Sequence, residues 1–247
     1  MISAHRGTAR GTRYAENTIA GLDALINRGY LMSEIDVARL KDGTHILYHD
    51  GVWEDGSTGR GAVAAVDWEK AEGYLLKDTQ GRLTSQTPPK LEDYLTHAQG
   101  RIYLEIDFKS SANYQQVIDM IRTKNMTNSV ILIAYNEGQA RTLSRLAPNM
   151  WISVSTQRSS DISKLGNEKL AAWLGKSLSD HTLIDRLEDM KTPILGSVGN
   201  EWSPDSALKA DVLVTDYAFD HRPISGLTRS TRKTYENCLT EKSSKAP

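Results

Sequence analysis

Cysteine is nearly absent from this 247-residue sequence, which has one, Cys238. A single cysteine cannot form an internal disulfide, so the fold does not depend on oxidation. A charge excess is absent too, because 30 lysines and arginines stand against 31 aspartates and glutamates, a formal net charge of −1. The sequence therefore lacks the positive field that attracts nucleic acid or anionic membranes, and any recognition of phosphate must be local.

Long apolar runs are also missing. No stretch reaches the about 18 consecutive apolar residues that a transmembrane segment needs, and no apolar leader precedes His5. We expect the protein in the cytoplasm or, if a leader has been removed, in the periplasm or outside the cell. What the sequence does contain is 39% hydrophobic and 25% charged residues, which is typical of a globular chain with one large core.

Short segments with the alternation of strands are separated by longer segments with a helical period. This order predicts βα units and a parallel sheet, and the length suits an α/β protein with a single eight-stranded (β/α)8 barrel of about 250 residues. Nine candidates compete for eight strand positions, and we expect residues 170–174 to be surplus. The strand candidates are residues 2–5, 32–40, 45–49, 102–108, 130–133, 151–155, 170–174, 194–198 and 212–215. The main helices are expected at residues 16–28, 90–98, 113–124, 137–146 and 182–190.

The barrel is expected to span residues 1–228 as one domain, with an inserted region after the third strand. This insertion, residues 51–89, is rich in glycine, serine, threonine and aspartate, with a short helical segment at residues 67–74. Such a long excursion is typical of a segment that passes over a functional site. Residues 229–247 form a polar tail that we expect to lie on the surface or to be disordered.

An Asp-Gly pair, Asp42 and Gly43, separates two of the strand candidates and is a strong signal for a two-residue hairpin turn. Pairing the strands outward from this turn places Asp36 opposite His49, since each lies six residues from its side of the turn. The turn therefore predicts that two polar motifs lie together.

Two strand candidates carry charged residues on one face. Glu34 and Asp36 are two residues apart, as are Glu105, Asp107 and Lys109, and side chains at this spacing leave the same face of a strand. On the inner face of a barrel, unpaired carboxylates would be very costly without a cation, whereas on an edge strand they would be solvated. If they bind a cation, oxygen ligands suit Mg²⁺ or Ca²⁺ better than zinc.

Histidines end two of the strand candidates. His5 is followed by Arg6 and Gly7, where glycine allows a sharp turn, and His49 is followed by Asp50. A lone histidine is more often structural than catalytic. Barrel enzymes, however, place their chemistry at the carboxyl ends of strands, so the two histidines together are candidates for proton transfer.

In their order and spacing, these motifs resemble the glycerophosphodiester phosphodiesterase family. The resemblance covers roughly residues 2–220, and its specificity comes from the motifs together, since no single one would suffice. The motifs are His5-Arg6-Gly7, Glu16-Asn17-Thr18, Glu34-Ile35-Asp36-Val37, Lys41-Asp42-Gly43, His49-Asp50, Pro89-Lys90-Leu91-Glu92, Asp107-Phe108-Lys109 and Val212-Leu213-Val214-Thr215-Asp216.

The resemblance implies a phosphodiesterase TIM barrel that hydrolyses glycerophosphodiesters to glycerol 3-phosphate and an alcohol, with one bound Mg²⁺ or Ca²⁺. The expected partner is therefore a small-molecule glycerophosphodiester and not a nucleic acid. Carried over by position, the metal ligands would be Glu34, Asp36 and Asp107, the catalytic acid and base His5 and His49, and the phosphate-binding residues Arg6 and Lys109.

The sequence departs from the family pattern in ways that affect the site. After His49-Asp50 the family usually carries an Arg-Thr-Thr-like segment, whereas residues 53–58 read Trp-Glu-Asp-Gly-Ser-Thr, so we expect a different substrate choice. The family's acid-x-Lys motif is often Glu-x-Lys, so Glu105 competes with Asp107 for the metal. We prefer Asp107 because it stands two residues before Lys109.

Two other functions compete with this interpretation. The same ligand set resembles spider-type phospholipase D enzymes, here acting on lysophospholipids, although their disulfide-braced loops need more than one cysteine. A non-catalytic barrel that binds a phosphorylated ligand is the alternative from another class, although it would need no proton-transfer pair. A nucleic-acid-binding role is not supported by any basic stripe or aromatic platform.

Overall fold

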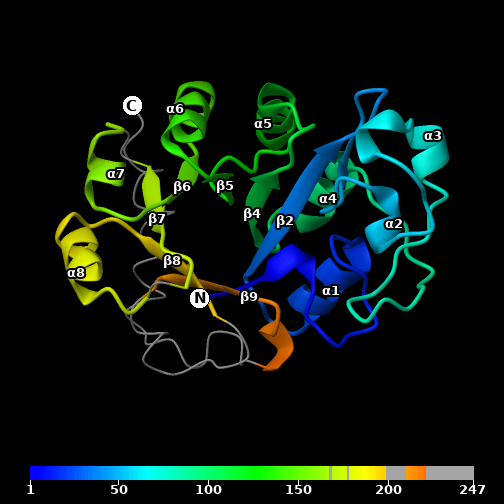
Figure 1. Ribbon diagram of the computed structural model, residues 1–247, viewed down its shortest axis with the longest axis horizontal. Coiled ribbons are helices and arrows are strands. Elements are labelled where there is room, and N and C mark those ends of the chain that lie inside the picture. Colours follow the sequence, from blue (N-terminus) through cyan, green and yellow to red (C-terminus); the bar gives the residue numbers. More distant parts are fainter. Residues whose placement is uncertain (167–168, 177, 199–209, 221–247) are drawn as a thin grey trace.

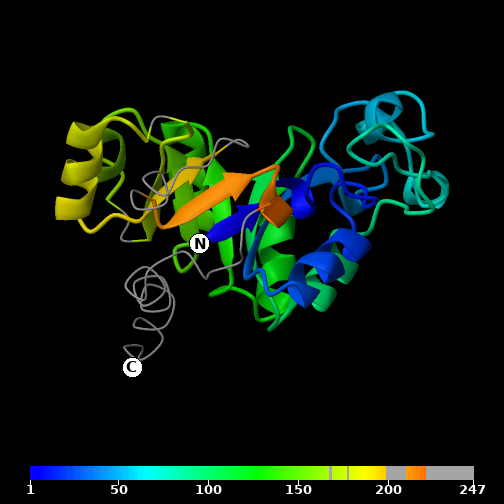
Figure 2. The same cartoon turned by 90° about the horizontal axis from the view of Figure 1, so that it is seen from below.

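A computed structural model describes residues 1–166, 169–176, 178–198 and 210–220. Within these residues, parallel strands form a closed eight-stranded barrel in the order β1-β9-β8-β7-β6-β5-β4-β2, with β1 pairing back to β2. Figure 2 shows β1 and β9, the first and last strands in the sequence, side by side. The predicted barrel is confirmed, and its strands are β1 (Ile2–Ala4), β2 (Met32–Arg39), β4 (Tyr103–Phe108), β5 (Val130–Ala134), β6 (Trp151–Ser155), β7 (Leu170–Trp173), β8 (Ile194–Ser197) and β9 (Val212–Thr215).

The surplus strand is β3 (His45–Leu47), which pairs antiparallel with β2 beyond the barrel ring. The expectation that residues 170–174 are surplus was wrong, because β7 pairs in parallel with both β6 and β8. The connection explains the difference. Parallel neighbours need a crossover of about a dozen residues or more, whereas the short link between β2 and β3 allows only an antiparallel return.

The hairpin register differs by one residue from the expected one. The Tyr48 N–H donates to the Asp36 carbonyl at 3.1 Å, so Asp36 lies opposite Tyr48 and not opposite His49. The reason is a three-residue loop over residues 41–43 in place of a two-residue turn, closed by the backbone bond between its flanking residues. Gly43 ends this loop with φ of +94°, a conformation that glycine adopts without steric cost.

Helices cover the outside of the barrel (Figure 1). They are α1 (Ile19–Asn27), α4 (Leu91–Ala98), α5 (Tyr114–Thr123), α6 (Glu137–Leu146), α7 (Ser160–Ser163) and α8 (His181–Asp189). Polar side chains cap the first turns of α1, α5, α6 and α8. In α1, Thr18 accepts a hydrogen bond from the Gly21 N–H, so this helix begins three residues later than expected. The apolar faces of the helices and the outer faces of the strands form the main core, which includes Leu22, Leu104 and Leu132.

The insertion after β3 is a small folded unit and not a loose excursion. It contains α2 (Trp53–Gly56), the short 3-10 helix η2 (Val63–Ala65) and α3 (Trp68–Ala71), which is shorter than the helix expected at residues 67–74. The buried Trp53 ring lies 4.6 Å from the Tyr48 ring and 5.0 Å from the Tyr74 ring, measured between centroids. This aromatic cluster gives the insertion its own core beside β2 (Figure 1).

Two further sequence predictions concern a membrane-spanning segment and the polar C-terminal tail. Among the described helices, none is long and apolar enough to cross a membrane. The predicted polar tail, residues 229–247, lies outside the described residues, as do residues 221–228 at the end of the predicted domain.

Candidate active site

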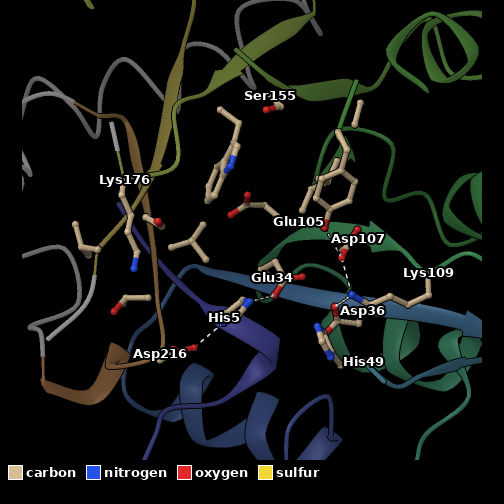
Figure 3. Close-up of a pocket in the computed structure, with 18 residues that line it drawn as sticks. His5, Glu34, Asp36, His49, Glu105, Asp107, Lys109, Ser155, Lys176 and Asp216 are labelled. Carbon is tan, nitrogen blue, oxygen red and sulfur yellow. Dashed lines mark hydrogen bonds and ion pairs between the residues drawn. The ribbon is translucent and has the colours of Figure 1, made fainter. Parts of the chain in front are cut away.

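A pocket of about 350 Å³ opens at the carboxyl ends of the barrel strands. It collects predicted site residues from β2 and β4 and from the segments that follow β1, β3 and β4. Figure 3 shows His5 beside Glu34 at one end of the group and His49 beside Asp36 at the other. The structure therefore brings together residues that are far apart in the sequence. The predicted residues that line the pocket are His5, Glu34, Asp36, His49, Asp107 and Lys109.

Glu34, Asp36 and Asp107 form an acid triad at the base of this pocket. All three side chains are buried, and one oxygen from each lies within 4.8 Å of the others. The register of the sheet produces this arrangement, since β2 and β4 pair in parallel with Asp36 directly beside Asp107. Adjacent strands thus present their carboxylates to one point, which is the geometry that a metal ion requires.

Lys109 lies between two members of the acid triad. Its Nζ is 2.6 Å from Asp36 Oδ1 and 2.7 Å from Asp107 Oδ2. Burial opposes its positive charge, but Asp36 and Asp107 outweigh that effect and raise the pKa of Lys109. One lysine cannot balance three carboxylates, and burial, followed by the nearby Asp36, raises the pKa of Glu34 well above its ordinary value.

The donor set fits a hard divalent cation. Asp107 Oδ1 is buried and has no hydrogen-bond partner among the described residues, while Oδ2 of the same carboxylate accepts bonds from Lys109 and from the Tyr135 hydroxyl at 2.8 Å. One oxygen is thus held in place and the other is left available. Such an oxygen is costly to bury unless a cation satisfies it.

Glu105 lies outside the acid triad. It precedes Asp107 by two residues on the same face of β4, one layer deeper in the barrel, and neither of its oxygens has a hydrogen-bond partner among the described residues. Burial raises the pKa of Glu105 to about 7, in spite of opposing effects from Ser3 and His5. The geometry groups Asp107, and not Glu105, with Glu34 and Asp36.

Asn17 holds Asp36 in position, a role that the motif Glu16-Asn17-Thr18 did not reveal. Its Nδ2 donates to Asp36 Oδ2 at 2.7 Å, and its Oδ1 accepts from the Asp36 N–H at 2.9 Å. Asn17 itself has φ of +59°, which asparagine tolerates better than most residues. The paired contacts fix both the backbone and the carboxylate of this acid.

Arg6 faces a neighbouring recess more than the main pocket. Its backbone has φ of 55°, which directs its N–H to Glu34 Oε2 at 2.7 Å. Its guanidinium donates to Glu16 at 3.0 Å and to His49 Nε2 at 2.8 Å. The predicted phosphate-binding side chain is therefore in contact with a candidate catalytic histidine.

Each candidate histidine is paired with a carboxylate. His5 Nδ1 lies 2.6 Å from Asp216, and His49 Nδ1 lies 2.8 Å from Asp50. The hydrogen bond with His5 is the main reason that the pKa of Asp216 is lowered. Sequence reasoning noted Asp216 only as the end of a strand motif, because 211 residues separate it from His5. The carboxyl-terminal position on a barrel strand was the signal that could have identified it.

The opposite wall of the pocket comes from β5 to β8 and is mainly apolar. It includes Ala134, Trp173 and Val198, with Tyr135 at the mouth, where the residue as a whole is 58% exposed. Lys176, in the loop after β7, lines the same wall and forms no salt bridge with a described residue. The sequence did not single out these residues, because apolar side chains at strand ends look the same as core.

The fold is shared with solved structures of phosphodiesterases. A glycerophosphoryl diester phosphodiesterase from Parabacteroides distasonis has a TM-score of 0.78 at 23% identity, covering 98% of this chain and 86% of that one. A glycerophosphodiester phosphodiesterase from Agrobacterium tumefaciens has a TM-score of 0.75 at 19% identity, covering 88% and 96%. An Oleispira antarctica phosphodiesterase, solved in complex with the product sn-glycerol-3-phosphate, has a TM-score of 0.70 at 17% identity, covering 90% and 97%.

Sequence comparison assigns the family. The uncharacterized protein YqiK of Bacillus subtilis is 27% identical over 162 residues, which span 63% of this chain and 66% of that relative. The model of the Glycerophosphoryl diester phosphodiesterase family matches residues 5–189, which include both histidines and the whole acid triad. The chain therefore belongs to the glycerophosphoryl diester phosphodiesterase family of enzymes.

Proposed function

We propose that this enzyme hydrolyses glycerophosphodiesters to glycerol 3-phosphate and an alcohol, with one divalent cation and two histidines as acid and base. The observation that carries the proposal is an acid triad flanked, in one pocket, by two histidine–carboxylate pairs. A purely ligand-binding barrel would need no such pairs. The product named for the Oleispira antarctica structure is the product expected here.

Glu34, Asp36 and Asp107 are the residues that would hold the cation. Their hard oxygens suit Mg²⁺ or Ca²⁺, and the unpaired Asp107 Oδ1 is the atom that most needs such a partner. A bound cation would neutralise the charge of the phosphodiester and lower the pKa of an attacking hydroxyl.

His49 suits the role of general base. An arginine can only donate, so His49 Nε2 must accept the 2.8 Å hydrogen bond from Arg6, and Nδ1 then carries the proton that is donated to Asp50. This is the neutral tautomer. Once Arg6 turns to a substrate phosphate, the Nε2 lone pair is free to take the proton of the hydroxyl group that attacks phosphorus. Water supplies the oxygen that finally replaces the alcohol on phosphorus.

His5 suits the role of general acid. Its Nδ1 is held by Asp216 at 2.6 Å, which fixes the orientation of the imidazole ring. Its Nε2 lies 3.9 Å from Glu34, on the side of the acid triad. From this position Nε2 can donate a proton to the leaving alkoxide as its bond to phosphorus breaks.

Arg6 and Lys109 are the proposed phosphate-binding residues. Lys109 now balances Asp36 and Asp107, and a cation on those carboxylates would take over that role and release the amine for a phosphate oxygen. Arg6 would exchange its contact with His49 for one with the phosphate, and its planar guanidinium can bind two oxygens of one phosphate.

The proposal is tested by product identification. The purified enzyme is stripped with a chelator, reloaded with Mg²⁺ or Ca²⁺, and given glycerophosphocholine, glycerophosphoethanolamine and glycerophosphoglycerol. We expect release of glycerol 3-phosphate that depends on the added cation. Release of choline from a lysophospholipid without any glycerol 3-phosphate from these diesters would favour the phospholipase D-like alternative, and substrate binding without cleavage would favour the non-catalytic barrel.

A further inference from the structure

A second hollow, which we call the Arg10 recess, adjoins the main pocket. It has a volume of about 170 Å³ and shares the side chains of His5 and Asp216 with that pocket. Three segments far apart in the sequence form it: the loop after β1, with Thr8 and Arg10, the end of β9, and Thr79 from the insertion. The recess thus begins at the candidate general acid.

The walls of the recess are fixed by backbone contacts. The Arg10 N–H donates to the Asp216 carbonyl at 2.6 Å, which ties the first loop to the end of β9. The next N–H, that of Gly11, donates to the Thr79 hydroxyl at 3.0 Å, which ties the same loop to the insertion. A preformed hollow of this kind loses little conformational entropy when it takes up a ligand.

Most charges that line the recess are already paired, and Arg10 is the exception. Arg6 is paired with Glu16 at 3.0 Å, and His5 is paired with Asp216. The exposed guanidinium of Arg10 contacts the Tyr217 hydroxyl at 3.4 Å and forms no salt bridge with any described residue. An arginine with unused donors, next to threonine hydroxyls, is suited to an anionic oxygen group.

We propose that the Arg10 recess binds the alcohol half of the substrate and favours an alcohol that carries a second anionic group, a phosphate or a carboxylate. This inference rests on the proposed function. If His5 gives its proton to the leaving oxygen, the alcohol must lie on the His5 side of the scissile bond, and the recess begins at that side chain. The acid triad, with a bound cation, would hold the phosphate next to His5 Nε2, which lies 3.9 Å from Glu34.

Lys176 offers a competing location for such an anion, because it also lacks a salt bridge among the described residues. It lies on the wall of the main pocket, which is otherwise mainly apolar, and Figure 3 shows it on the far side from His49 and Lys109. The recess is favoured because its lining is polar throughout and because it adjoins the proton donor. The experiment separates the two locations.

The test compares three glycerophosphodiesters that differ in the charge of the alcohol. The alcohol of glycerophosphoglycerol is neutral, that of glycerophosphoglycerate carries a carboxylate, and that of bis(glycerophospho)glycerol carries a second phosphodiester. We expect kcat/KM to be about five- to tenfold higher for at least one anionic substrate than for the neutral one, the range of a charge-assisted contact that is partly exposed. The two anionic arms distinguish carboxylate from phosphate.

Arg10→Gln should lower this anionic-to-neutral ratio to about one, and Arg10→Lys should restore part of it. Arg13→Gln is the matched control, because it removes the same charge from an exposed residue of the same loop that does not line the recess. It should keep the ratio of the unmodified enzyme. A loss of the ratio in Arg13→Gln would mean that only the long-range field matters.

Binding measurements give the corresponding ratio of affinities for anionic and neutral diesters without any turnover. Calorimetric dissociation constants of the three diesters are measured with the cation-loaded His49→Ala enzyme, which should hold them uncleaved. If no diester is cleaved by the unmodified enzyme, the proposed function fails, but the binding ratio still decides the role of the recess. Equal affinities for neutral and anionic diesters, or a ratio lost in Lys176→Gln and kept in Arg10→Gln, would overturn the inference.

Discussion

The two halves of the barrel differ sharply in what they place in the pocket. The strands β1, β2 and β4, with the residues directly after them, supply His5, the acid triad and Lys109. The strands β5 to β8 supply alanine, serine, tryptophan and other uncharged side chains, and their charged contribution, Lys176, comes from a loop. The parallel strands of the barrel thus serve two purposes: those of the first half carry the charged side chains, and those of the second half shape the pocket.

The largest expected effect follows from removing the proposed base in the charged half. His49→Ala should lower kcat by about 10²- to 10⁴-fold, because proton transfer is lost while the cation site stays intact. Steady-state kinetics at saturating cation measures this. His97→Ala is the matched control, since His97 also pairs with a carboxylate, Asp23 at 3.1 Å, but does not line the pocket. Similar losses in both variants would end the assignment of His49.

The next effect concerns the cation. Asp107→Asn should weaken Mg²⁺ or Ca²⁺ binding by about 100-fold, because it removes a charged ligand whose Oδ1 is otherwise unpaired. Titration calorimetry on the chelator-treated protein measures it. Asp119→Asn, an exposed acid on α5, removes the same charge and should leave the affinity unchanged. An unaltered affinity in Asp107→Asn would point to Glu105 as the ligand.

Glu105 predicts a pH effect on stability. Its pKa rises from 4.5 to about 7 on folding, so the folded state keeps a proton that the unfolded chain releases. The contribution of Glu105 to stability should therefore fall as pH rises from about 4.5 to about 7 and stay low above that. Relative to the unmodified protein, Glu105→Gln should remove this contribution to the slope and raise the unfolding free energy at pH 8 by about 1–3 kcal/mol. Urea unfolding with chelator present measures both, and an unchanged slope would contradict the pKa shift.

Tyr135 breaks the division between the halves, since it follows β5 but donates to Asp107 at 2.8 Å. Tyr135→Phe keeps the ring at the mouth and removes that hydrogen bond. We expect cation affinity to fall by about tenfold, the lower end of the range that is typical when the hydrogen-bond partner of a metal ligand is lost. Calorimetry should show this loss of cation affinity while the free energy of unfolding stays unchanged. Equal cation affinity in Tyr135→Phe and the unmodified protein would mean that Tyr135 only lines the pocket.

The smallest effect should sharpen the comparison. Trp173→Leu alters the uncharged wall, and we expect KM to rise about threefold through lost apolar contact with the substrate. Cation affinity should stay the same, because Trp173 contacts no member of the acid triad in the described contacts. A fall in cation affinity would show that the two halves are coupled.

The sequence was sufficient for the barrel and for the groups in its charged half. Glu34 and Asp36 were recognisable as one charged strand face, and Glu105, Asp107 and Lys109 as another, because a period of two places such residues on the same side of a strand. Their role as cation ligands came from the family resemblance and stays a prediction. His5 and His49 were recognisable because they end strands. In each case a local pattern fixed the position of the side chain relative to its neighbours.

Other features depend on contacts that no local pattern encodes. Asp216 meets His5 only because the barrel closes, which brings β9 beside β1. The register of the hairpin depends on the length of its loop, which has three residues and not the two that the sequence predicted. Tyr135 reaches Asp107 across a strand boundary, and a tyrosine after a strand carries no sign of its partner.

Lys109 also bears on the order of folding and cation binding. A site of bare carboxylates would have to wait for its ion before the barrel could close, and folding would then depend on ion supply. Here the amine already lies against Asp36 and Asp107 at 2.6 Å and 2.7 Å, so two of the three carboxylates are partly balanced before any ion binds. On the proposed function, loading would exchange one positive charge for another. The cellular ion level would then govern how much of the protein works, and a cation that binds the folded state alone would add to the stability of the fold.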